Sequence, residues 1–491
     1  MTVERKEKWK QALRAVSPYD GRYYEIGEDL SSFFSEGALQ YYRLRVEVAW
    51  LAYQVLHPDL TFPEGLANSM KGDRTKDLCR KLQDLACNYS EEDALRIKEL
   101  ECECNHDVKA VELFLAEKVK SYGFGGLRPY IHLGCTSEDI TNIAYAWAIT
   151  NATEHIILPE LKAVLEKLSE FVEQYAGTPM LAHTHGQPAT PSTFGKVMSV
   201  PYMRLIDCYL NLSSNFIAKA KFSGATGNFA AMAAAYPDKN WPEIMEDFIS
   251  DDYGLLDDME FIFNPYTDQI DPHDWLARLL NELKLTLQIL RDFDTDCWLY
   301  IHKGYLGQKV VSGEVGSSTM PNKVNPITFE NSEGACKVAT GLINAIADEL
   351  PRSRMQRDLS DSIVQRHIGL VFASALQALR QTQKGLNKIV VDEAALKDDL
   401  DAHPEVLAEA IQTRLRRRGV ADAYYRLKEL TRGRAVTLTM LHAFIDAQSE
   451  FTTEDKEYLK ALRPETYTGW SKAIAEKAIE DTKYLFAPTP Y

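Results

Sequence analysis

Residues 158–175, LPELKAVLEKLSEFVEQY, contain the pattern that decides the fold class. The apolar side chains in this stretch are separated by 4, 3, 4 and 3 residues, the spacing of a helix that packs along one seam of a bundle. These positions are Leu161, Leu165, Leu168, Val172 and Tyr175. Pro159 suits a first helical turn and Gly177 a position just beyond a helix end, so the pattern predicts a helix over about 159–177.

A second seam with the same spacing lies in residues 276–290, between Pro272 and Gly304. A third helix-like stretch, rich in Ala, Leu and Val, runs from Ile363 to about Gly385. Few segments alternate with a period of two, so little sheet is expected. The predicted fold class is all-α, with a long central helical bundle and less regular regions around it.

Two short stretches rich in turn-forming residues divide the chain, Gly123–Pro129 and Gly385–Lys388. As linkers they predict an N-terminal helical domain at 1–129, a central long-helix bundle domain at 130–386 and a C-terminal helical domain at 387–491.

The amino-acid composition and net charge argue against several classes of protein. The 491 residues are 45% hydrophobic and 26% charged, which is typical of a folded globular protein. The formal net charge of −16 argues against a nucleic-acid surface, and the lack of any apolar stretch of about 18 residues argues against a membrane span. The eight cysteines are scattered and imply no disulfide framework, so we expect a cytoplasmic protein.

The basic run at residues 416–418, followed by Gly419, is the only segment that suggests a localisation or nucleic-acid signal. Basic side chains in a last helical turn complement the helix dipole, and a following glycine permits a left-handed cap. We therefore predict a helix end at this run.

A polar loop at residues 313–333, GEVGSSTMPNKVNPITFENSE, concentrates groups that bind anions. Pro321 and Pro326 interrupt any helix in this stretch. Ser317, Ser318, Lys323 and Asn325 bring hydroxyls, an ammonium and an amide together, which are the groups that bind a carboxylate or an enolate-like anion. The alternative is a solvated Gly/Ser loop.

Residues 182–191, AHTHGQPATP, place two histidines ahead of a glycine and two prolines. The pattern predicts imidazoles at a helix break rather than on an apolar face. His185 suits a proton donor there, because imidazole titrates near neutral pH, whereas His183 fits a structural role.

A third group, CECNHD at residues 102–107, permits two interpretations. If the segment is helical, Cys102 and His106 share a face, and Cys104 or Asp107 could complete a zinc ligand set. The usual spacing of two residues between thiolates is missing and no second Cys/His pair follows, so we favour Asn105, His106 and Asp107 as polar contacts at a pocket.

Three arginines, Arg22, Arg357 and Arg366, lie in otherwise polar segments. Guanidinium groups can hold a phosphate through two hydrogen bonds, which an acidic protein would need at a phosphate site. The alternative is that they form surface salt bridges.

Together these segments resemble one family. GSSTMPNKVNP at 316–326 is similar to the signature loop of the fumarase/aspartase superfamily, whose members cleave C–N or C–O bonds by β-elimination and release fumarate. Further segments, between about Val16 and the C-terminal region, resemble the adenylosuccinate lyase branch, particularly its bacterial-type form. They are DGRY (20–23), TSEDI (136–140), THGQPATP (184–191), NPYTDQI (264–270), PHD (272–274) and RDLSDS (357–362).

The resemblance implies a fold, a reaction and partners. The fold is a three-domain, fumarase/aspartase-like one, with long helices that join in a homotetramer whose active sites are shared between subunits. The reaction is the elimination of fumarate from adenylosuccinate, giving AMP, and from the succinyl-carboxamide ribotide SAICAR, giving AICAR. The resemblance implies no cofactor, no metal, no nucleic acid and no membrane partner.

Roles follow from position in the matching motifs. Ser317 is implied as the base and His185 as the acid, while Lys323 and Asn325 would hold the succinyl carboxylate and stabilise developing charge. The residues implied to fix the fumarate portion are Thr136, Ser137, Gln269 and Ser318. Those implied to hold the phosphate and ribose are Arg22, Tyr23, Arg357, Ser362 and Arg366. Those implied to line the pocket are Asn105, His106, Asp107 and Asn331.

Two positions depart from the family pattern. Asn322 stands where adenylosuccinate lyases commonly have His, and His183 stands where a larger or charged residue is frequent. Neither replaces a residue with an implied role, so the departures bear on fine substrate preference. Two other functions remain, a sister lyase acting on another succinyl compound and an inactive structural scaffold. The arginines argue against the first, and the joint presence of Ser317, His185 and Lys323 argues against the second.

Overall fold

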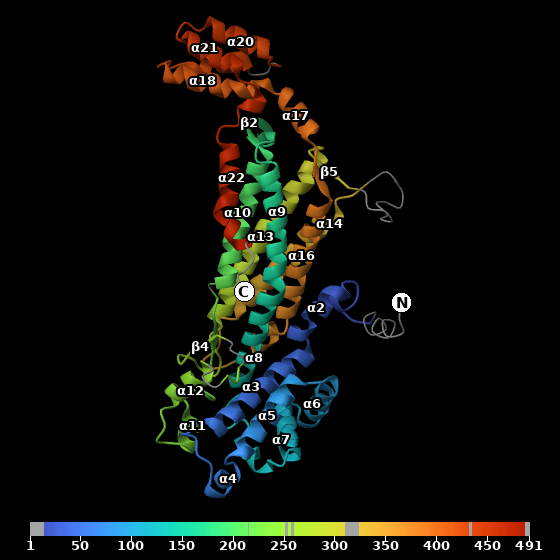
Figure 1. Ribbon diagram of the computed structural model, residues 1–491, viewed down its shortest axis with the longest axis vertical. Coiled ribbons are helices and arrows are strands. Elements are labelled where there is room, and N and C mark those ends of the chain that lie inside the picture. Colours follow the sequence, from blue (N-terminus) through green and yellow to red (C-terminus); the bar gives the residue numbers. More distant parts are fainter. Residues whose placement is uncertain are drawn as a thin grey trace. The chain divides into compact units, whose positions relative to one another are not determined.

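The structure, a computed structural model, describes residues 14–214, 216–250, 254–256, 260–309, 324–431 and 435–486 (Figure 1). The chain forms two compact units, each assembled from three stretches of sequence. The first unit combines Met1–Glu160, Cys208–Leu287 and Ala335–Gln377, and the second combines Leu161–Asp207, Gln288–Gly334 and Ala378–Tyr491. Among the described residues, no helix has both the length and the hydropathy needed to cross a bilayer.

In the first unit, helix α3 (Glu36–Leu56) is the central element. It packs against α8 (Ser137–Ala152), α5 (Asp73–Cys87) and α7 (Asp107–Ser121), as Figure 1 shows. The shorter helices of this unit are α2 (Tyr24–Phe34), α4 (Glu64–Ser69), α6 (Glu91–Cys104), α11 (Ala230–Ala235), α12 (Trp241–Ile249) and α15 (Ser360–Gln365).

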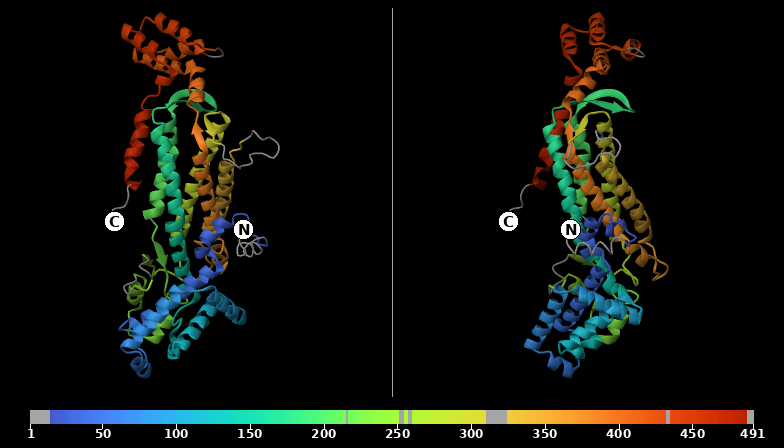
Figure 2. Two further views of the ribbon diagram at one scale, coloured as in Figure 1. Left: turned by 45° about the vertical axis from the view of Figure 1, so that its right-hand side comes forward. Right: turned by 90° about the vertical axis from the view of Figure 1, so that its right-hand side faces the viewer.

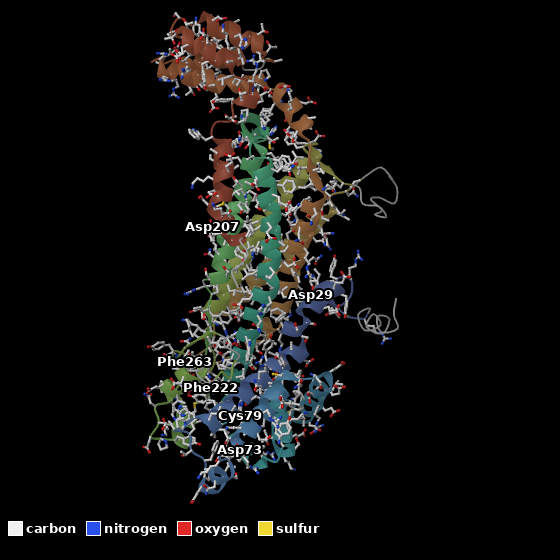
Figure 3. All side chains as sticks on the ribbon, in the orientation of Figure 1. Asp29, Asp73, Cys79, Asp207, Phe222 and Phe263 are labelled. Carbon is white, nitrogen blue, oxygen red and sulfur yellow. The ribbon has the colours of Figure 1, made fainter. Side chains whose placement is uncertain are left out.

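Two apolar clusters hold the first unit together. One joins α3, α5, α6 and α7 and includes Leu51, Leu82, Ile97 and Phe114, all at most 1% exposed. The other is aromatic, with the Phe222 ring 5.1 Å from those of Trp50 and Phe248. Phe222 follows β3 (Ala218–Ala220), which pairs in parallel with β4 (Phe261–Phe263), and Figure 3 shows Phe222 and Phe263 near each other.

The second unit contains two short antiparallel ladders and a small helical bundle. Strands β1 (Pro179–Thr184) and β2 (Gln187–Thr193) form a hairpin, and β5 (Leu306–Gln308) pairs with β6 (Ile389–Val391). A bundle, orange and red in both views of Figure 2, is formed by α18 (Ala408–Arg417), α19 (Ala423–Thr431), α20 (Leu438–Ala447) and α21 (Thr453–Ala461). These four helices enclose an apolar core. The remaining helices confined to this unit are α17 (Glu393–Asp401) and α22 (Ser471–Thr482).

Five long helices contribute residues to both units: α9 (Leu158–Gln174), α10 (Phe194–Ser214), α13 (Asp274–His302), α14 (Ile327–Glu349) and α16 (Ile368–Lys388). Except for Tyr175, which follows the end of α9, the residues of the two predicted seams lie on α9 and α13, and their side chains are buried. The five leucines of the second seam are at most 2% exposed: Leu276, Leu280, Leu283, Leu287 and Leu290. The all-α fold class is confirmed, and the expectation of little sheet agrees with the three two-stranded ladders found among the described residues.

The helix predicted to start at Pro159 has no break before it. Helix α8 continues through a π-helical segment, Thr153–Ile157, directly into α9. Proline lacks an N–H and clashes with the carbonyl four residues earlier, and a wider π turn accommodates such a residue within a helix. Pro159 therefore marks an irregularity within a helix, and its interpretation as a helix start was wrong.

The predicted helix from Ile363 to Gly385 is interrupted, because α15 ends at Gln365 and α16 starts at Ile368. The linker at Gly385–Lys388 was wrong, since α16 includes these residues and β6 follows at once. The other proposed linker contains a 3-10 turn at Gly125–Tyr130 with Leu127 fully buried. The division into domains 1–129, 130–386 and 387–491 stays a prediction.

The basic run ends a helix, as predicted. Helix α18 ends at Arg417, and Gly419 adopts a left-handed φ of 84°. Arg414, two residues before the run, and Arg418, its last residue, each donate from Nε to the carboxylate of Asp455, at 2.6 Å. These charge-assisted hydrogen bonds hold the pKa of Asp455 well below its usual range and tie α18 to the first turn of α21.

One acidic side chain is buried among the long helices of the second unit. Asp294 on α13 is fully buried and accepts a hydrogen bond from Thr382 on α16, at 2.8 Å. The Thr382 hydroxyl lies 2.9 Å from that of Ser332 on α14. Burial raises the pKa of Asp294 to about 8, despite the hydrogen bonds from these hydroxyls. The chain of three polar groups thus joins three helices around a carboxyl that is mostly protonated at neutral pH.

This environment predicts an unusual pH dependence of stability. The carboxyl ionises near pH 4 in the unfolded chain and only near pH 8 in the folded one, so its contribution to stability falls as the pH rises between these values. Asp294→Asn keeps an oxygen that accepts from Thr382 but cannot ionise. We expect the thermal midpoint of the variant relative to wild type to rise, by on the order of 5 °C between pH 5.5 and pH 8.5. A difference in midpoint that stays constant across this range would contradict the assignment.

Candidate functional site

His185 lies at the tip of the β1–β2 hairpin. Thr184 pairs with Gln187, so His185 and Gly186 form a two-residue loop, and their φ angles are 55° and 72°. Positive φ at both loop positions defines a type I′ turn, for which Asn-Gly is the favoured sequence. A histidine in this conformation is strained, and such strain concentrates at functional sites. The hairpin replaces the helix break predicted here, and it presents the exposed His185 side chain to solvent.

The other candidate residues of the second unit lie near the start of α14. Asn331 is exposed in the second turn of this helix, and Asn325 precedes the helix by two residues. Beside Asn331, Glu330 accepts a hydrogen bond from Trp298 Nε1, at 3.1 Å. Three predicted site residues, Ser317, Ser318 and Lys323, lie outside the described residues.

In the first unit, two of the predicted residues are in direct contact. Arg366 donates to Asp107 Oδ2 at 3.0 Å, and the buried Arg43 donates to the same oxygen at 2.8 Å. Arg43 also donates to Thr141 on α8. Burial alone would raise the pKa of Asp107, but the charge of Arg43 and the hydrogen bonds to both guanidinium groups lower it to about 2. Asp107 is therefore ionised at any physiological pH and holds two arginines together.

Arg357 is held between two buried carboxyl groups. It donates to Asp361 at 2.9 Å and to Glu138 at 3.1 Å. Burial raises the pKa of Glu138, with the nearby Asp361 adding to this effect and the charge of Arg357 opposing it. One oxygen each of Glu138 and Asp361 is buried without a hydrogen-bond partner in the described residues. The fully buried His273 lies 3.6 Å from Asp361 and adds a further titratable group.

The Thr136–Ser137 segment is fixed at the start of α8 by a buried ion pair. The Thr136 N–H donates to Asp139 Oδ2 at 2.6 Å. The other oxygen, Oδ1, accepts from Lys221 Nζ at 2.5 Å and from the N–H groups of Ser223 and Gly224. Both charged side chains are 0% exposed. Asp139 therefore connects the predicted substrate-binding turn to the chain that follows β3.

The remaining predicted residues of this unit lie at element ends. Asn105 is the left-handed C-cap of α6, and the exposed His106 is the N-cap of α7 and accepts from the Lys109 N–H. Gln269 donates its backbone N–H to the backbone oxygen of Gln356, which lies four residues ahead of α15, the helix that contains Ser362. Arg22 and Tyr23 immediately precede α2. A cleft of about 230 Å³ lies beside the 3-10 turn Pro18–Asp20, which precedes α2. Its lining includes Asp20, Ser31 and Arg366.

The structure does not support a zinc site in residues 102–107. Helix α6 ends at Cys104, so Cys102 and His106 do not share a helical face. Cys104 Sγ instead donates to the backbone oxygen of His106. Within the described ranges, no group of three or more His, Cys, Asp or Glu side chains is arranged to hold a metal ion. All eight cysteines, which lie in these ranges, are free thiols.

Sequence reasoning missed several residues that hold the predicted ones. Arg43 is one of them, and a signal was available, since an arginine within the apolar and aromatic run of α3 is expected to have a buried partner. Glu138, Asp361 and His273 lie inside quoted motifs, but their burial around Arg357 brings together segments far apart in the sequence. No local pattern predicts that arrangement.

Comparison with known protein families identifies two matches along the chain. A family model described as "Lyase" matches residues 63–341. A second, described as "Adenylosuccinate lyase C-terminal", matches residues 353–468. The first match alone covers more than half of the chain, including the hairpin that presents His185.

Curated relatives match over nearly the full length. An adenylosuccinate lyase from Vibrio cholerae is 43% identical over 467 residues, 95% of this chain and 99% of the relative. The adenylosuccinate lyase of Escherichia coli K12 is 42% identical over 459 residues, 93% of this chain and 97% of the relative. One from Legionella pneumophila is 43% identical over 95% of this chain and 98% of the relative.

Solved structures share the fold at lower identity. A fumarate lyase from Mesorhizobium superposes with a TM-score of 0.71 at 18% identity, covering 92% of this chain and 97% of the other. The 3-carboxy-cis,cis-muconate lactonizing enzyme of Pseudomonas putida has a TM-score of 0.70 at 21% identity, covering 94% and 98%. These similarities confirm the fumarase/aspartase-like fold.

The buried ion pair beneath Thr136 gives a stability prediction. Asp139→Ala leaves the Lys221 ammonium buried without its partner, which costs about 3–5 kcal/mol of unfolding free energy. We expect a clear fall in the urea midpoint at pH 7. The matched control is Asp59→Ala, which removes an exposed partner of Lys239 at 2.7 Å and should change the midpoint little. Equal effects of the two substitutions would show that burial of the pair does not matter.

Proposed function

The chain belongs to the adenylosuccinate lyase family, and from this membership we propose how its residues divide the work of the reaction. The protein is a carbon–nitrogen lyase that eliminates fumarate from adenylosuccinate, giving AMP, and from SAICAR, giving AICAR. Identity of 42–43% with curated adenylosuccinate lyases over almost the whole chain is the observation on which this function rests. The activity belongs to purine nucleotide biosynthesis.

The elimination requires a base and an acid. The base removes a proton from the carbon next to a carboxylate, which creates a doubly charged aci-carboxylate, and the acid then protonates the departing nitrogen. We propose Ser317 as the base and His185 as the acid. A serine hydroxyl is a weak base, so its activation requires nearby cationic or N–H groups and exclusion of water. The position of His185 at an exposed, strained turn supports its assignment, because a hairpin tip can reach a substrate held by other elements.

The substrates are anionic at two ends, with two carboxylates and a phosphate. Lys323 and Asn325 are proposed to hold the succinyl carboxylate, and Thr136, Ser137, Gln269 and Ser318 the rest of the fumarate portion. Support for the second group comes from the start of α8, where the backbone N–H of Thr136 is already fixed by Asp139.

The phosphate and ribose are assigned to the arginine-rich part of the first unit, to Arg22, Tyr23, Arg357, Ser362 and Arg366. Asn105, His106 and Asp107 are proposed to line the pocket there, together with Asn331. The contact between Arg366 and Asp107 supports this grouping. A guanidinium has five N–H donors, so the ion pairs of Arg357 and Arg366 leave donors for a phosphate while the carboxylates fix the orientation of each group.

We also propose that the protein is a homotetramer with active sites shared between subunits. The predicted seams do not supply the interface, because this chain already buries them. Other apolar side chains on the long helices are exposed, including Leu285 and Leu299 on α13 and Val338 on α14, at 44–54%. Such side chains on long helices fit a surface that another subunit covers.

A cytoplasmic location is proposed as well. The support is the set of eight free thiols, since disulfides are rare where glutathione keeps cysteines reduced. The bacterial relatives named above catalyse a step of nucleotide synthesis, which also fits this compartment.

The assignment of the acid is tested with His185→Asn. Asparagine tolerates a left-handed φ and creates the Asn-Gly sequence favoured in type I′ turns, so the hairpin should be kept while the acid is removed. We expect kcat for adenylosuccinate cleavage, followed by the ultraviolet change, to fall about 10²–10⁴-fold with an unchanged thermal midpoint. Full activity in this variant would remove His185 from the mechanism. Absence of AMP formation by the wild-type protein would contradict the function itself and leave the sister lyase or the scaffold.

The assignment of the base is tested separately with Ser317→Ala. Loss of the hydroxyl removes proton abstraction but leaves the cationic groups that bind the carboxylates, so we expect kcat to fall by orders of magnitude while KM changes little. The matched control is Ser318→Ala, which removes the neighbouring hydroxyl and is expected to affect KM more than kcat. Reversal of the two patterns would assign the base to the neighbour.

A further inference from the structure

We infer that His183 and Lys303 form a positioning pair that holds the hairpin tip in place, and that the pair exists only while His183 is uncharged. This inference rests on the proposed role of His185. The observation behind it is a distance of 2.7 Å between His183 Nε2, on β1, and Lys303 Nζ, just after α13. From the sequence alone, His183 fits a structural role and departs from the family pattern, but no partner for it is predicted.

The distance fixes the tautomer of His183. An ammonium group has three donors and no acceptor, so the imidazole nitrogen must accept the hydrogen bond and the ring proton must lie on Nδ1. Burial and the adjacent Lys303 charge both lower the pKa of His183. A protonated ring would place two positive charges at hydrogen-bond distance and remove the acceptor, so protonation breaks the pair.

Lys303 is itself held in position from a neighbouring helix. Its ammonium lies 3.3 Å from Asp399 Oδ2 on α17, and the Tyr305 hydroxyl donates to the same oxygen. On the other side, His403 Nε2 lies 3.7 Å from Asp399 Oδ1, while its Nδ1 lies 2.7 Å from Glu405. The groups that act on His183 electrostatically are therefore Lys303 after α13, Asp399 on α17 and His403 after it.

The hairpin needs this side-chain contact near its tip. His183 pairs with Pro188, and proline has no N–H to donate to the ladder. Farther from the tip, the hairpin is fixed by Leu181, which packs with Leu400 and Val406, and by a hydrogen bond from Thr190 to Glu409. His183 is two residues from His185, so its contact with Lys303 anchors the last part of the strand before the turn.

The consequence for the reaction is a loss of rate at low pH that adds to any loss from protonation of the reacting base. Low pH supplies the proton that the acid His185 needs, yet it also protonates His183 and releases the tip of the hairpin. A misplacement of about 1 Å can cost on the order of 10²-fold in rate. The acid side of the kcat profile is therefore expected to include the ionisation of His183.

The first test compares two replacements of His183. His183→Gln supplies an amide oxygen that accepts from Lys303 and does not titrate, whereas His183→Ala removes the contact. We expect His183→Gln to keep kcat at pH 7.5 within about threefold and to extend activity to lower pH. We expect His183→Ala to lower kcat about 10- to 100-fold with a much smaller change in KM. A glutamine variant with the acid limit of the wild-type protein overturns the inference.

The second test examines the partner. Lys303→Met should reproduce the loss seen in His183→Ala, and the double variant should lose no more than either single one, because both changes break the same contact. Additive losses would overturn the pairing. His155→Gln, which removes an exposed histidine from the π-helical segment, serves as the matched control and should leave the pH profile unchanged.

The outcome for His185→Asn separates this inference from the proposed function. If that variant is inactive while the His183 and Lys303 variants behave as the wild-type protein does, the positioning pair alone is refuted. If His185→Asn is fully active, the proposed acid is refuted, and the pair has no reacting group to position. Thermal unfolding of each variant shows whether a loss of kcat comes from general destabilisation.

Discussion

Burial of a continuous apolar seam along each long helix is the constraint on which the rest of the structure depends. The seam leucines of α13, from Leu276 to Leu290 in steps of 4, 3, 4 and 3 residues, are almost completely excluded from water, and so are the seam residues of α9. At about 25 cal/mol per Å² of apolar surface, such seams supply much of the stability of a helical protein. Reactive polar groups are disfavoured within these buried seams, because a buried polar group needs a hydrogen-bond partner. The buried Asp294 has such a partner in Thr382.

The candidate site residues accordingly lie where helices end. Thr136 and Ser137 stand at the start of α8, Asn105 to Asp107 at the junction of α6 and α7, and His185 in a hairpin turn. At these places backbone N–H groups are free of the helical ladder and side chains reach solvent. The packed helices therefore fix the positions of the candidate site residues, although these residues lie at helix ends and in a turn rather than in the helix core.

Local charge, rather than net charge, decides what the first unit can bind. The chain has a net charge of −16, yet Arg43, Arg357 and Arg366 gather near Asp107, Glu138 and Asp361. Each carboxylate lowers the repulsion between neighbouring guanidinium groups and holds their planes in fixed directions. An arginine that is already oriented loses less conformational entropy when an anion binds, which fits recognition of a phosphate by an acidic protein.

The sequence was sufficient for the seams, the fold class and the helix end after Arg417, because each depends on a local spacing. It was insufficient where distant segments decide the local structure. Pro159 has the position expected of a helix start, but the preceding helix is extended by a π segment. The hairpin at residues 179–193 was missed because its prolines obscure the period of two and its turn has His where Asn or Asp is usual. The two histidines of this hairpin show the same limit, because both lie in one sequence motif but have different surroundings in the fold. His183 contacts Lys303, whose charge opposes protonation of the imidazole, whereas His185 lies in an exposed turn. The different surroundings of the two histidines thus arise from the packing of the second unit, in which the end of α13 lies beside β1.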